Sequence, residues 1–528
     1  MSTTPEWLEA LLRPDAYPHS VTEIRMLETH ISWIFLTGEW AYKLKKPVNL
    51  GFVDFTTLTL RRDACKEEIR LNRRTAPELY DAVVPLCAEG DHFRFQAEGE
   101  HIIEYAVRMH QFPQEALLAQ CLERDELSLE LIETLARNVA ELHRMGAVAG
   151  PQSPFGEPEL VLNSVQVCLD EVVRTQLPAA LIAQLSPLQN WVGLEWKRLK
   201  STFQQRKEQG LVRECHGDLH LGNLVLYQGS PTLFDCLEFN PQLRWIDIIS
   251  DIGFLVMDLL DRKRSELAWR ALNAWLEQTG DYAGLSVLKF YLTYRALVRA
   301  KVAAIRLRQP SLSQAEEQHQ HELLESYLAL ATQQTAPGTP AIILMQGVSG
   351  SGKSFVAREL VSLLGAIQIR SDVERKRLLG QWPVSTSSWI PETIAYSKET
   401  TLRTYKQLQE LARSIVQSGN TAIIDASFLD HSNRASFMAL AGDLRVPFVI
   451  VACQAPQRIL EKRVEDRQTM GQDASDADVE ILRQQVNSQV PLSDAELGLT
   501  ISLDTSREPI ENVLPLLRQR LNRPAVLL

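Results

Sequence analysis

The chain has 528 residues, a length at which one hydrophobic core is unusual and two or three domains are expected. Its apolar content of 45% and charged content of 23% are ordinary for a soluble globular protein. The formal net charge of −11 gives no support to non-specific nucleic-acid binding. The seven cysteines are scattered and never spaced as CxxC, which argues against a disulfide framework or a zinc site. Without an export signal or a long apolar run, we expect a cytoplasmic protein that has no membrane partner.

The first part of the chain is predicted to be rich in strands and the following part to be helical. Strand-like runs are expected at 21–27, 32–36 and 40–46, a helix from about 60 to 74, and more short strands through 107. From 116 onward the pattern is mostly helical, including 131–144 and 187–209. We therefore predict an α+β protein-kinase-like domain over 1–331, with a small lobe over about 1–110 and a large lobe over about 111–331. The outline alone is weak evidence, because many α+β chains share it.

The segment HGDLHLGN, residues 216–223, carries residues suited to phosphoryl transfer. Asp218 can accept or orient the proton of an acceptor hydroxyl, and Asn223 can offer a neutral oxygen to a metal. After a predicted hairpin, Asp235 arrives where a second carboxylate can bridge Mg²⁺ to the phosphates of ATP. A zinc site on His216 and His220 is disfavoured, since a glycine between them breaks any helix and no third ligand is evident.

These residues resemble those of aminoglycoside phosphotransferases and related small-molecule kinases, whose loop begins HGD and whose metal Asp lies in a D-x-x-E segment, here Asp235 and Glu238. The resemblance implies an ATP lysine on the third strand, where alternation puts Lys43 and Lys45 on one face. We choose Lys43 and keep Lys45 as second choice. The expected carboxylate partner is Glu68, preferred over Glu67. Main-chain groups in the segment 104–112, around Val107 and Met109, are expected to bind adenine.

A second phosphate-binding signature follows a linker at 332–340, where two prolines and a glycine lie among small polar residues. The segment GVSGSGKS follows a strand-like run at 341–345 and opens an apparent helix at 354–364, which is the context a P-loop requires. Its main-chain N–H groups would cradle phosphate, Lys353 would reach the β- and γ-oxygens, and Ser354 would ligate Mg²⁺. The residues expected to bind the nucleotide are Gly347, Ser349, Gly350, Ser351, Gly352, Lys353 and Ser354.

Strand-like runs alternate with helical stretches through 341–528, which predicts an α/β domain with a parallel sheet. Further strands are expected at 367–370, 421–425, 448–452 and 499–503. Asp372 and Arg375 follow the second strand, where an Asp could take a proton from an acceptor and an Arg could hold a phosphate. Asp425 ends the third strand, in the position of a Walker-B-like metal carboxylate.

Arg463 and Arg467 are four residues apart on one predicted helix face, before a polar loop-like segment at 468–478. We interpret them as lid arginines that close over the transferring phosphoryl group. The alternative is a solvated helix face shared with Glu461 and Glu465.

The second domain resembles the compact P-loop kinases: gluconate and shikimate kinases, chloramphenicol phosphotransferase, zeta-type toxins and the kinase domain of bacteriophage polynucleotide kinase. The whole chain is similar to a bacterial family that fuses the two kinds of domain, which implies use of ATP and Mg²⁺ but names no substrate. Three hypotheses remain. Both domains phosphorylate small hydroxylated molecules, which we prefer; or the P-loop domain is a nucleic-acid 5′-hydroxyl kinase; or one domain is a nucleotide-binding regulator. The oligomeric state is left open.

Overall fold

The computed structural model describes residues 5–51, 53–90, 92–96, 101–175, 179–309, 312–382, 397–470 and 478–522. The chain forms two compact units, one of residues 1–170 with 194–258 and one of residues 171–193 with 259–528. None of the helices in these described ranges combines the length and the apolarity that a membrane crossing needs.

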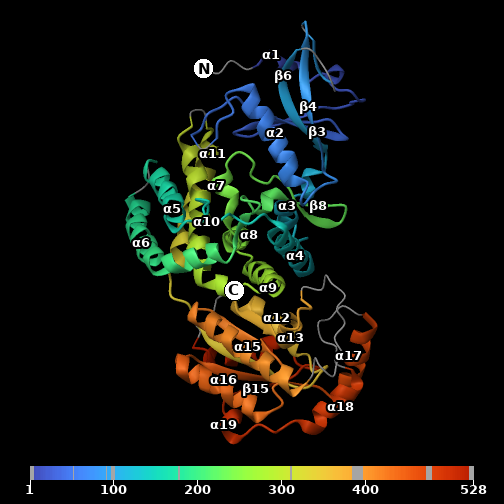
Figure 1. Ribbon diagram of the computed structural model, residues 1–528, viewed down its shortest axis with the longest axis vertical. Coiled ribbons are helices and arrows are strands. Elements are labelled where there is room, and N and C mark those ends of the chain that lie inside the picture. Colours follow the sequence, from blue (N-terminus) through green and yellow to red (C-terminus); the bar gives the residue numbers. More distant parts are fainter. Residues whose placement is uncertain are drawn as a thin grey trace. The chain divides into compact units, whose positions relative to one another are not determined.

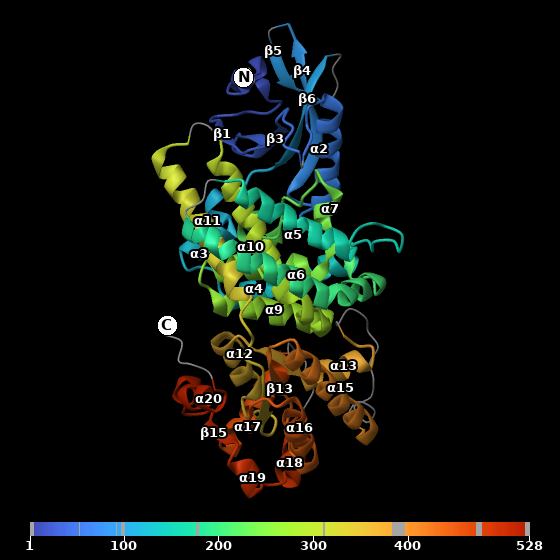
Figure 2. The same cartoon turned by 90° about the vertical axis from the view of Figure 1, so that its left-hand side faces the viewer.

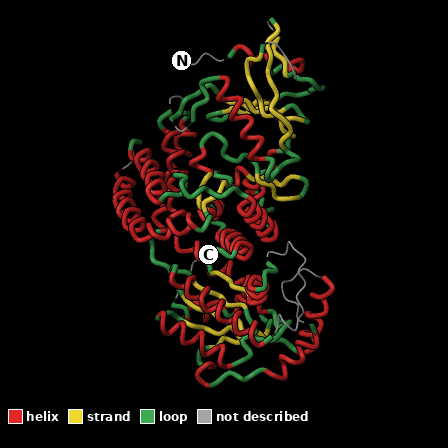
Figure 3. The backbone as a smooth tube through the Cα atoms, in the orientation of Figure 1, coloured by secondary structure: helices red, strands yellow, loops and turns green. Residues whose placement is uncertain are grey.

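The first unit begins with a six-stranded antiparallel sheet in the order β1-β2-β3-β6-β4-β5 (Figures 1 and 3). Its strands are β1 (Arg25–Glu28), β2 (Ser32–Leu36), β3 (Trp40–Lys45), β4 (Tyr80–Glu89), β5 (His92–Phe95) and β6 (Ile102–His110). A short helix, α1 (Glu6–Ala10), precedes it, and α2 (Leu58–Asn72) packs on β4 and β6.

The alternation of β3 places its side chains in two different environments. Tyr42 and Leu44 belong to an aromatic-rich cluster with residues of the amino-terminal segment, whereas Ala41 packs with α2 residues such as Cys65. Since neighbouring strand residues point to opposite faces, Lys43 and Lys45 share the α2 face with Ala41. Both lysines are buried.

The large lobe is mostly helical. Its helices are α3 (Leu118–Glu123), α4 (Leu129–Met145), α5 (Pro158–Val173), α6 (Ala179–Glu208), α7 (Pro241–Arg244) and α8 (Ile248–Asp261). Two small antiparallel ribbons frame the segment that carries the predicted catalytic residues. They pair β7 (Val212–Glu214) with β10 (Trp245–Asp247) and β8 (Leu224–Tyr227) with β9 (Ser230–Leu233).

The second unit holds a five-stranded parallel sheet in the order β12-β13-β11-β14-β15. Its strands are β11 (Ala341–Gln346), β12 (Ile367–Arg370), β13 (Thr421–Asp425), β14 (Phe448–Gln454) and β15 (Thr500–Asp504). Every residue of the central strand β11 is buried, as an uninterrupted apolar run with helices on both faces predicts. Ligands bind such sheets at the carboxyl ends of the strands, near the point where the strand order reverses.

Helices surround this sheet and precede it. Those before it are α9 (Ser265–Thr279), α10 (Leu285–Leu307) and α11 (Gln314–Gln334). Those that follow its first strand along the chain are α12 (Lys353–Leu364), α13 (Ser371–Leu378), α15 (Lys398–Gln417), α16 (His431–Leu444), α17 (Gln457–Met470), α18 (Val479–Ser488), α19 (Asp494–Leu497) and α20 (Leu514–Arg520). Figure 2 shows α13 next to α15, and the two helices pack against one another.

The predicted fold class is confirmed: a protein-kinase-like α+β part is followed by a P-loop part with a parallel sheet. The five strands of the parallel sheet begin within one residue of the predicted positions. The proposed domain division at 332–340 stays a prediction. Helices α9, α10 and α11, which it assigns to the first domain, fall in the same compact unit as the P-loop sheet.

Candidate active sites

Asp218 lies in the loop between β7 and β8, and neighbouring side chains hold its carboxylate. Asn223 Nδ2 donates to the main-chain oxygen of Asp218 at 2.9 Å and to its Oδ2 at 3.0 Å. His220 Nε2 lies 3.5 Å from the same Oδ2. The Asp218 side chain is 36% exposed, so an acceptor hydroxyl could reach it. Because the Asn223 amide nitrogen is turned to Asp218, its Oδ1 is the atom that could ligate a metal.

Asp251 of α8 braces this loop from behind. Its carboxylate accepts the N–H groups of His216 at 3.0 Å and Gly217 at 2.9 Å, and it lies 3.0 Å from His143 Nε2. Gly217 has φ +89°, and a Cβ there would lie 2.9 Å from the carbonyl oxygen of Leu243, so glycine is required for conformation and for space. These contacts give Asp251 a structural role in the loop.

His143, Cys215 and Asp251 are buried with their potential ligand atoms within 4.8 Å of one another, the kind of group that can hold a metal. However, both Asp251 oxygens already accept main-chain N–H groups of the catalytic loop. We therefore assign this cluster to support of the loop. Sequence reasoning missed His143, which on its own looks like a histidine on the buried face of α4.

Four ion pairs join β3, α2 and the segment around Asp235. Lys43 Nζ contacts Glu68 Oε1 at 2.9 Å and also Asp235, while Lys45 contacts both Glu68 and Glu238. Only Lys43 reaches Asp235, which favours it over Lys45 as the residue beside a bound phosphate. Burial opposes ionisation of Glu68, but Lys43 and Lys45 lower its pKa to about 2.

The neighbouring carboxylate, Glu67, points elsewhere. It pairs with Arg70 at 2.7 Å and with Arg244 at 2.6 Å, rather than with either lysine. The geometry therefore supports the choice of Glu68 as the partner of the ATP lysine.

Asp235 has φ +59°, which is unusual for a residue other than glycine. Its N–H donates to Tyr80 Oη at 3.1 Å, and the N–H of Cys236 donates to Asn72 Oδ1 at 2.9 Å. The buried Asn72 is anchored in turn by donating from Nδ2 to the carbonyl oxygen of Glu68. Strained conformations of this kind persist where surrounding contacts fix them, often at functional sites. Sequence reasoning missed Tyr80 and Asn72.

The structure differs from the expectation for Val107 and Met109. Both lie inside β6, where Val107 is paired with Lys43 and Val83, and Met109 with Ala41 and Tyr80. Their main-chain groups face ladder partners on both sides, and β6 ends only at His110. Because a strand between two neighbours has no main-chain groups to spare, the geometry does not support adenine binding by these two residues.

In the second unit, the loop from Gly347 runs from β11 into α12, which begins at Lys353. Lys353 Nζ donates to the carbonyl oxygen of Val348 at 2.8 Å. Burial lowers the pKa of the Lys353 ammonium, and the Asp425 carboxylate opposes that shift. The N–H of Ser349 donates to Gln485 Oε1 of α18 at 2.7 Å, so an amide oxygen lies where a phosphate oxygen is expected.

A cavity of about 490 Å³ brings most of the predicted P-loop residues together. It is lined by Ser349, Gly350, Gly352, Lys353, Ser354, Asp372, Arg375, Asp425, Arg463 and Arg467, with further polar residues. Gly347 and Ser351 belong to the same loop but do not line it. A volume of this size suits small ligands.

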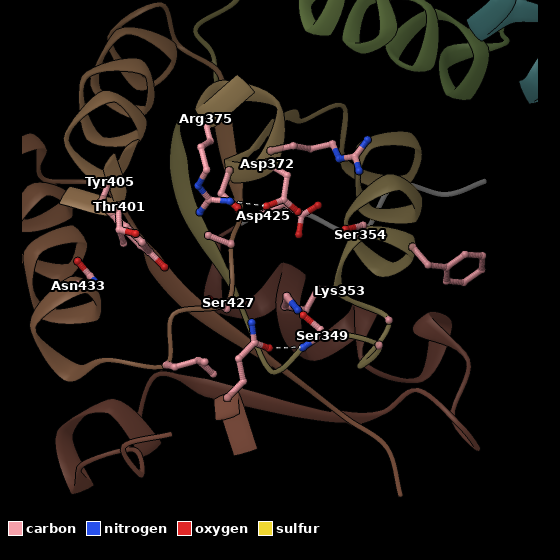
Figure 4. Close-up of a pocket in the computed structure, with 18 of the residues that line it drawn as sticks. Ser349, Lys353, Ser354, Asp372, Arg375, Thr401, Tyr405, Asp425, Ser427 and Asn433 are labelled. Carbon is pink, nitrogen blue, oxygen red and sulfur yellow. Dashed lines mark hydrogen bonds and ion pairs between the residues drawn. The ribbon is translucent and has the colours of Figure 1, made fainter. Parts of the chain in front are cut away.

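Figure 4 shows the order of the groups along this cavity. Ser349, Lys353 and Ser354 lie on one side, and Thr401, Tyr405 and Asn433 on the other. Between these two walls lie the predicted chemical groups, Asp372, Arg375 and Asp425.

The central groups are held in place. Arg375 Nη1 lies 2.9 Å from Asp372 Oδ1, and Gln368 Nε2 donates to Asp425 Oδ2 at 2.9 Å. Asp425 is 5% exposed and could ligate a metal together with Ser354. Thr401, Tyr405 and Asn433 were missed, because polar residues on α15 and α16 look like ordinary solvent-facing positions.

Arg463 and Arg467 both line the cavity. Arg463 donates from Nη1 to Thr505 Oγ1 at 2.9 Å and to the carbonyl oxygen of Gly350 at 3.2 Å, and from Nη2 to the carbonyl oxygen of Thr505 at 3.0 Å. Arg463 therefore contacts the P-loop and the loop after β15, and it is not part of a solvated helix face. Of the predicted lid segment at 468–478, residues 471–477 lie outside the described residues.

Two family models match the chain. Residues 54–291 match the phosphotransferase enzyme family, and residues 342–492 match an AAA domain. An uncharacterized protein of Mycobacterium tuberculosis is 29% identical over 460 residues, which cover 87% of this chain and 89% of that protein.

Solved structures are similar to each part. A choline/ethanolamine kinase family protein from Mesorhizobium loti is 12% identical, covering 62% of this chain and 100% of that chain with a TM-score of 0.38. A gluconokinase from Sinorhizobium meliloti is 19% identical, covering 35% of this chain and 93% of that chain with a TM-score of 0.25.

The family matches and the geometry of the two sites define a kinase-like enzyme. The protein is a phosphotransferase in which residues 54–291 match the phosphotransferase enzyme family and residues 342–492, which carry the P-loop, match an AAA domain.

Proposed function

We propose that the protein is an ATP- and Mg²⁺-dependent phosphotransferase with two separate nucleotide sites. Each site transfers the γ-phosphate to a hydroxyl group of a small molecule. In the first site, Lys43 holds the phosphates, Asn223 and Asp235 hold Mg²⁺, and Asp218 orients the acceptor hydroxyl and takes its proton. The metal, when bound, neutralises charge on the phosphates, and the protein side chains supply the positioning.

In the second site, Lys353 and the P-loop N–H groups hold the phosphates, and Ser354 and Asp425 hold Mg²⁺. Asp372 takes the proton of the acceptor, and Arg375 holds Asp372 in position. Arg467 reaches the same cavity and would stabilise the transferring phosphoryl group.

The observation that carries the proposal is the order of groups in the cavity of the second unit. A wall of hydroxyl and amide groups faces the P-loop, and the predicted proton acceptor lies between them. Hydroxyl, phenol and amide side chains such as Thr401, Tyr405 and Asn433 suit a small acceptor that carries several hydroxyl groups, because each can donate and accept hydrogen bonds. The net charge of −11 favours such an acceptor over a nucleic acid.

The test is ATP turnover by wild type, Asp218→Asn and Lys353→Ala against sugars, nucleosides, aminoglycosides and 5′-hydroxyl oligonucleotides. We expect acceptor-stimulated ADP release that Asp218→Asn removes for one acceptor and Lys353→Ala for another. Stimulation by oligonucleotides alone would instead identify a polynucleotide kinase. Stimulated turnover that only one of the two variants removes would mark the other domain as a regulator, and turnover that no acceptor stimulates would refute the proposal.

A further inference from the structure

Helix α9 belongs by sequence to one domain and by contacts to the other. It lies inside the stretch that matches the phosphotransferase model, which extends to residue 291. Its residues nevertheless pack in the compact unit of the P-loop sheet, where Trp269 lies against the core formed by β11 and α12. This raises the question of what α9 does for the P-loop site.

The carboxyl end of α9 is capped by residues of the P-loop domain. The last carbonyl groups of a helix lack partners within the helix and carry a partial negative charge. Arg377 Nη2 donates to the carbonyl oxygen of Glu277 at 2.6 Å, and Trp382 Nε1 donates to the same oxygen at 2.8 Å. Gly280, which ends the helix with φ +72°, leaves room for the guanidinium, since a Cβ there would lie 2.8 Å from Arg377 Nη1.

Arg377 is part of α13, the helix that carries Asp372 and Arg375. The Glu277 carboxylate also lies 3.5 Å from Arg370, the residue that precedes α13 and lines the cavity. The contacts with Arg370 and Arg377 therefore fix α13 near both of its ends.

Asn273, one helical turn before Glu277, binds the edge strand β12 as a neighbouring strand would. Its Oδ1 accepts the N–H of Gln368 at 2.7 Å, and its Nδ2 donates to the carbonyl oxygen of Ala366 at 3.0 Å. Gln368 then donates from its side chain to Asp425. Asn273 is thus connected through Gln368 to the carboxylate of Asp425 at the end of β13.

We propose that α9 is a positioning element of the P-loop transfer site, with Arg377 and Asn273 as positioning residues. It holds the acceptor side, α13 and β12, through the hydrogen bonds of Arg377 and Asn273, whereas its contact with α12 is apolar packing around Trp269 together with one ion pair of Arg270. A helix from the stretch that matches the phosphotransferase model thereby contributes to the P-loop active site. Only the turnover measurement below rests on the proposed function.

The test uses the full chain with Lys43→Met, which removes the phosphate lysine of the first site so that nucleotide binding and turnover report the P-loop site, and compares Arg377→Met with Arg377→Lys. The matched control is Glu359→Gln, which removes an ion pair between Arg270 of α9 and α12 at 3.7 Å without touching α13 or β12. Hydrogen exchange and the dissociation constant for AMP-PNP with Mg²⁺ are measured for each variant, and turnover is measured with the best acceptor.

For Arg377→Met we expect about tenfold faster exchange at 371–378, a dissociation constant within about twofold of the parent, and turnover reduced about tenfold. Arg377→Lys should restore part of the protection from exchange at 371–378 and part of the turnover, because an ammonium group also donates to helix-terminal carbonyls. Glu359→Gln should change none of these quantities. Unchanged exchange at 371–378, or equally faster exchange at 371–378 and in α12, would overturn the proposal. A parent protein without acceptor-stimulated turnover would refute the proposed function. The exchange result alone would then decide whether α9 positions α13.

Discussion

Replacing Lys45 by methionine tests the buried ion-pair cluster of the first unit. The Lys45 and Glu68 side chains are fully buried, and Glu238 is 4% exposed. Lys45→Met would leave two carboxylates with one fewer cation in a medium of low polarity. Removing one partner from a buried ion pair costs about 3–5 kcal/mol. With an m-value of about 1–3 kcal/mol/M, the urea midpoint of the first unit should fall by about 1 M or more.

The assay is urea unfolding followed by tryptophan fluorescence, with Lys46→Met as the matched control. Lys46 is the next residue, but its partner Glu28 is 57% exposed, so the control should lose no more than about 1 kcal/mol. Adding Glu238→Gln to Lys45→Met should restore part of the loss, because it removes one unpaired charge. A free energy of unfolding for Lys45→Met within 1 kcal/mol of wild type would refute the reasoning.

The same cluster predicts a pH dependence. The pKa of Glu68 is lowered in the folded protein from its ordinary value of 4.5 to about 2. A lowered carboxyl pKa contributes stability that is present above 4.5 and is lost as the pH falls from 4.5 towards 2. The difference in stability between wild type and Lys45→Met should therefore shrink across this interval.

Three further predictions concern the active sites. Gln485→Ala frees the N–H of Ser349, so the affinity for AMP-PNP should rise about 2- to 10-fold by calorimetry; a lower affinity would show that Gln485 helps to bind nucleotide. Burial lowers the pKa of Lys353 in the free protein, and a bound phosphate would raise it. Nucleotide binding should therefore take up a proton, and the affinity should fall as the pH rises from the pKa of the free protein to that of the complex. Calorimetry in buffers of different ionisation enthalpy measures the proton uptake, and its absence at every alkaline pH would contradict the prediction. Asp251→Asn should lower Asp218-dependent turnover about tenfold or more, because an amide cannot accept from both loop N–H groups; turnover equal to wild type would exclude the bracing role.

Local patterns predicted the fold class, and they also supplied the candidate site residues, whose roles stay predictions. Strand alternation was enough to put Lys43 and Lys45 on one face, and the geometry then showed that only Lys43 reaches Asp235. The P-loop could be located because its loop, the strand before it and the helix after it are contiguous in sequence. These features have short-range causes: side-chain alternation, glycine conformation and helix-terminal N–H groups.

The features that the sequence did not reveal all depend on contacts between distant segments. Asn273 meets Ala366 across 93 residues and Gln485 meets Ser349 across 136, and neither residue has a local pattern that signals a partner. The failed expectation for Val107 and Met109 has the same origin. Their main-chain groups are taken up because β6 lies between β3 and β4, and the position of a strand within a sheet is set by tertiary pairing.

The central claim is that one chain holds two separate nucleotide sites, and counting bound nucleotides tests it most directly. Native mass spectrometry or equilibrium dialysis with AMP-PNP and Mg²⁺ would be applied to wild type, Lys43→Met, Lys353→Ala and the double variant. We predict two nucleotides per chain for wild type, one for each single variant and none for the double variant. One nucleotide per chain in wild type, or two in either single variant, would contradict the account.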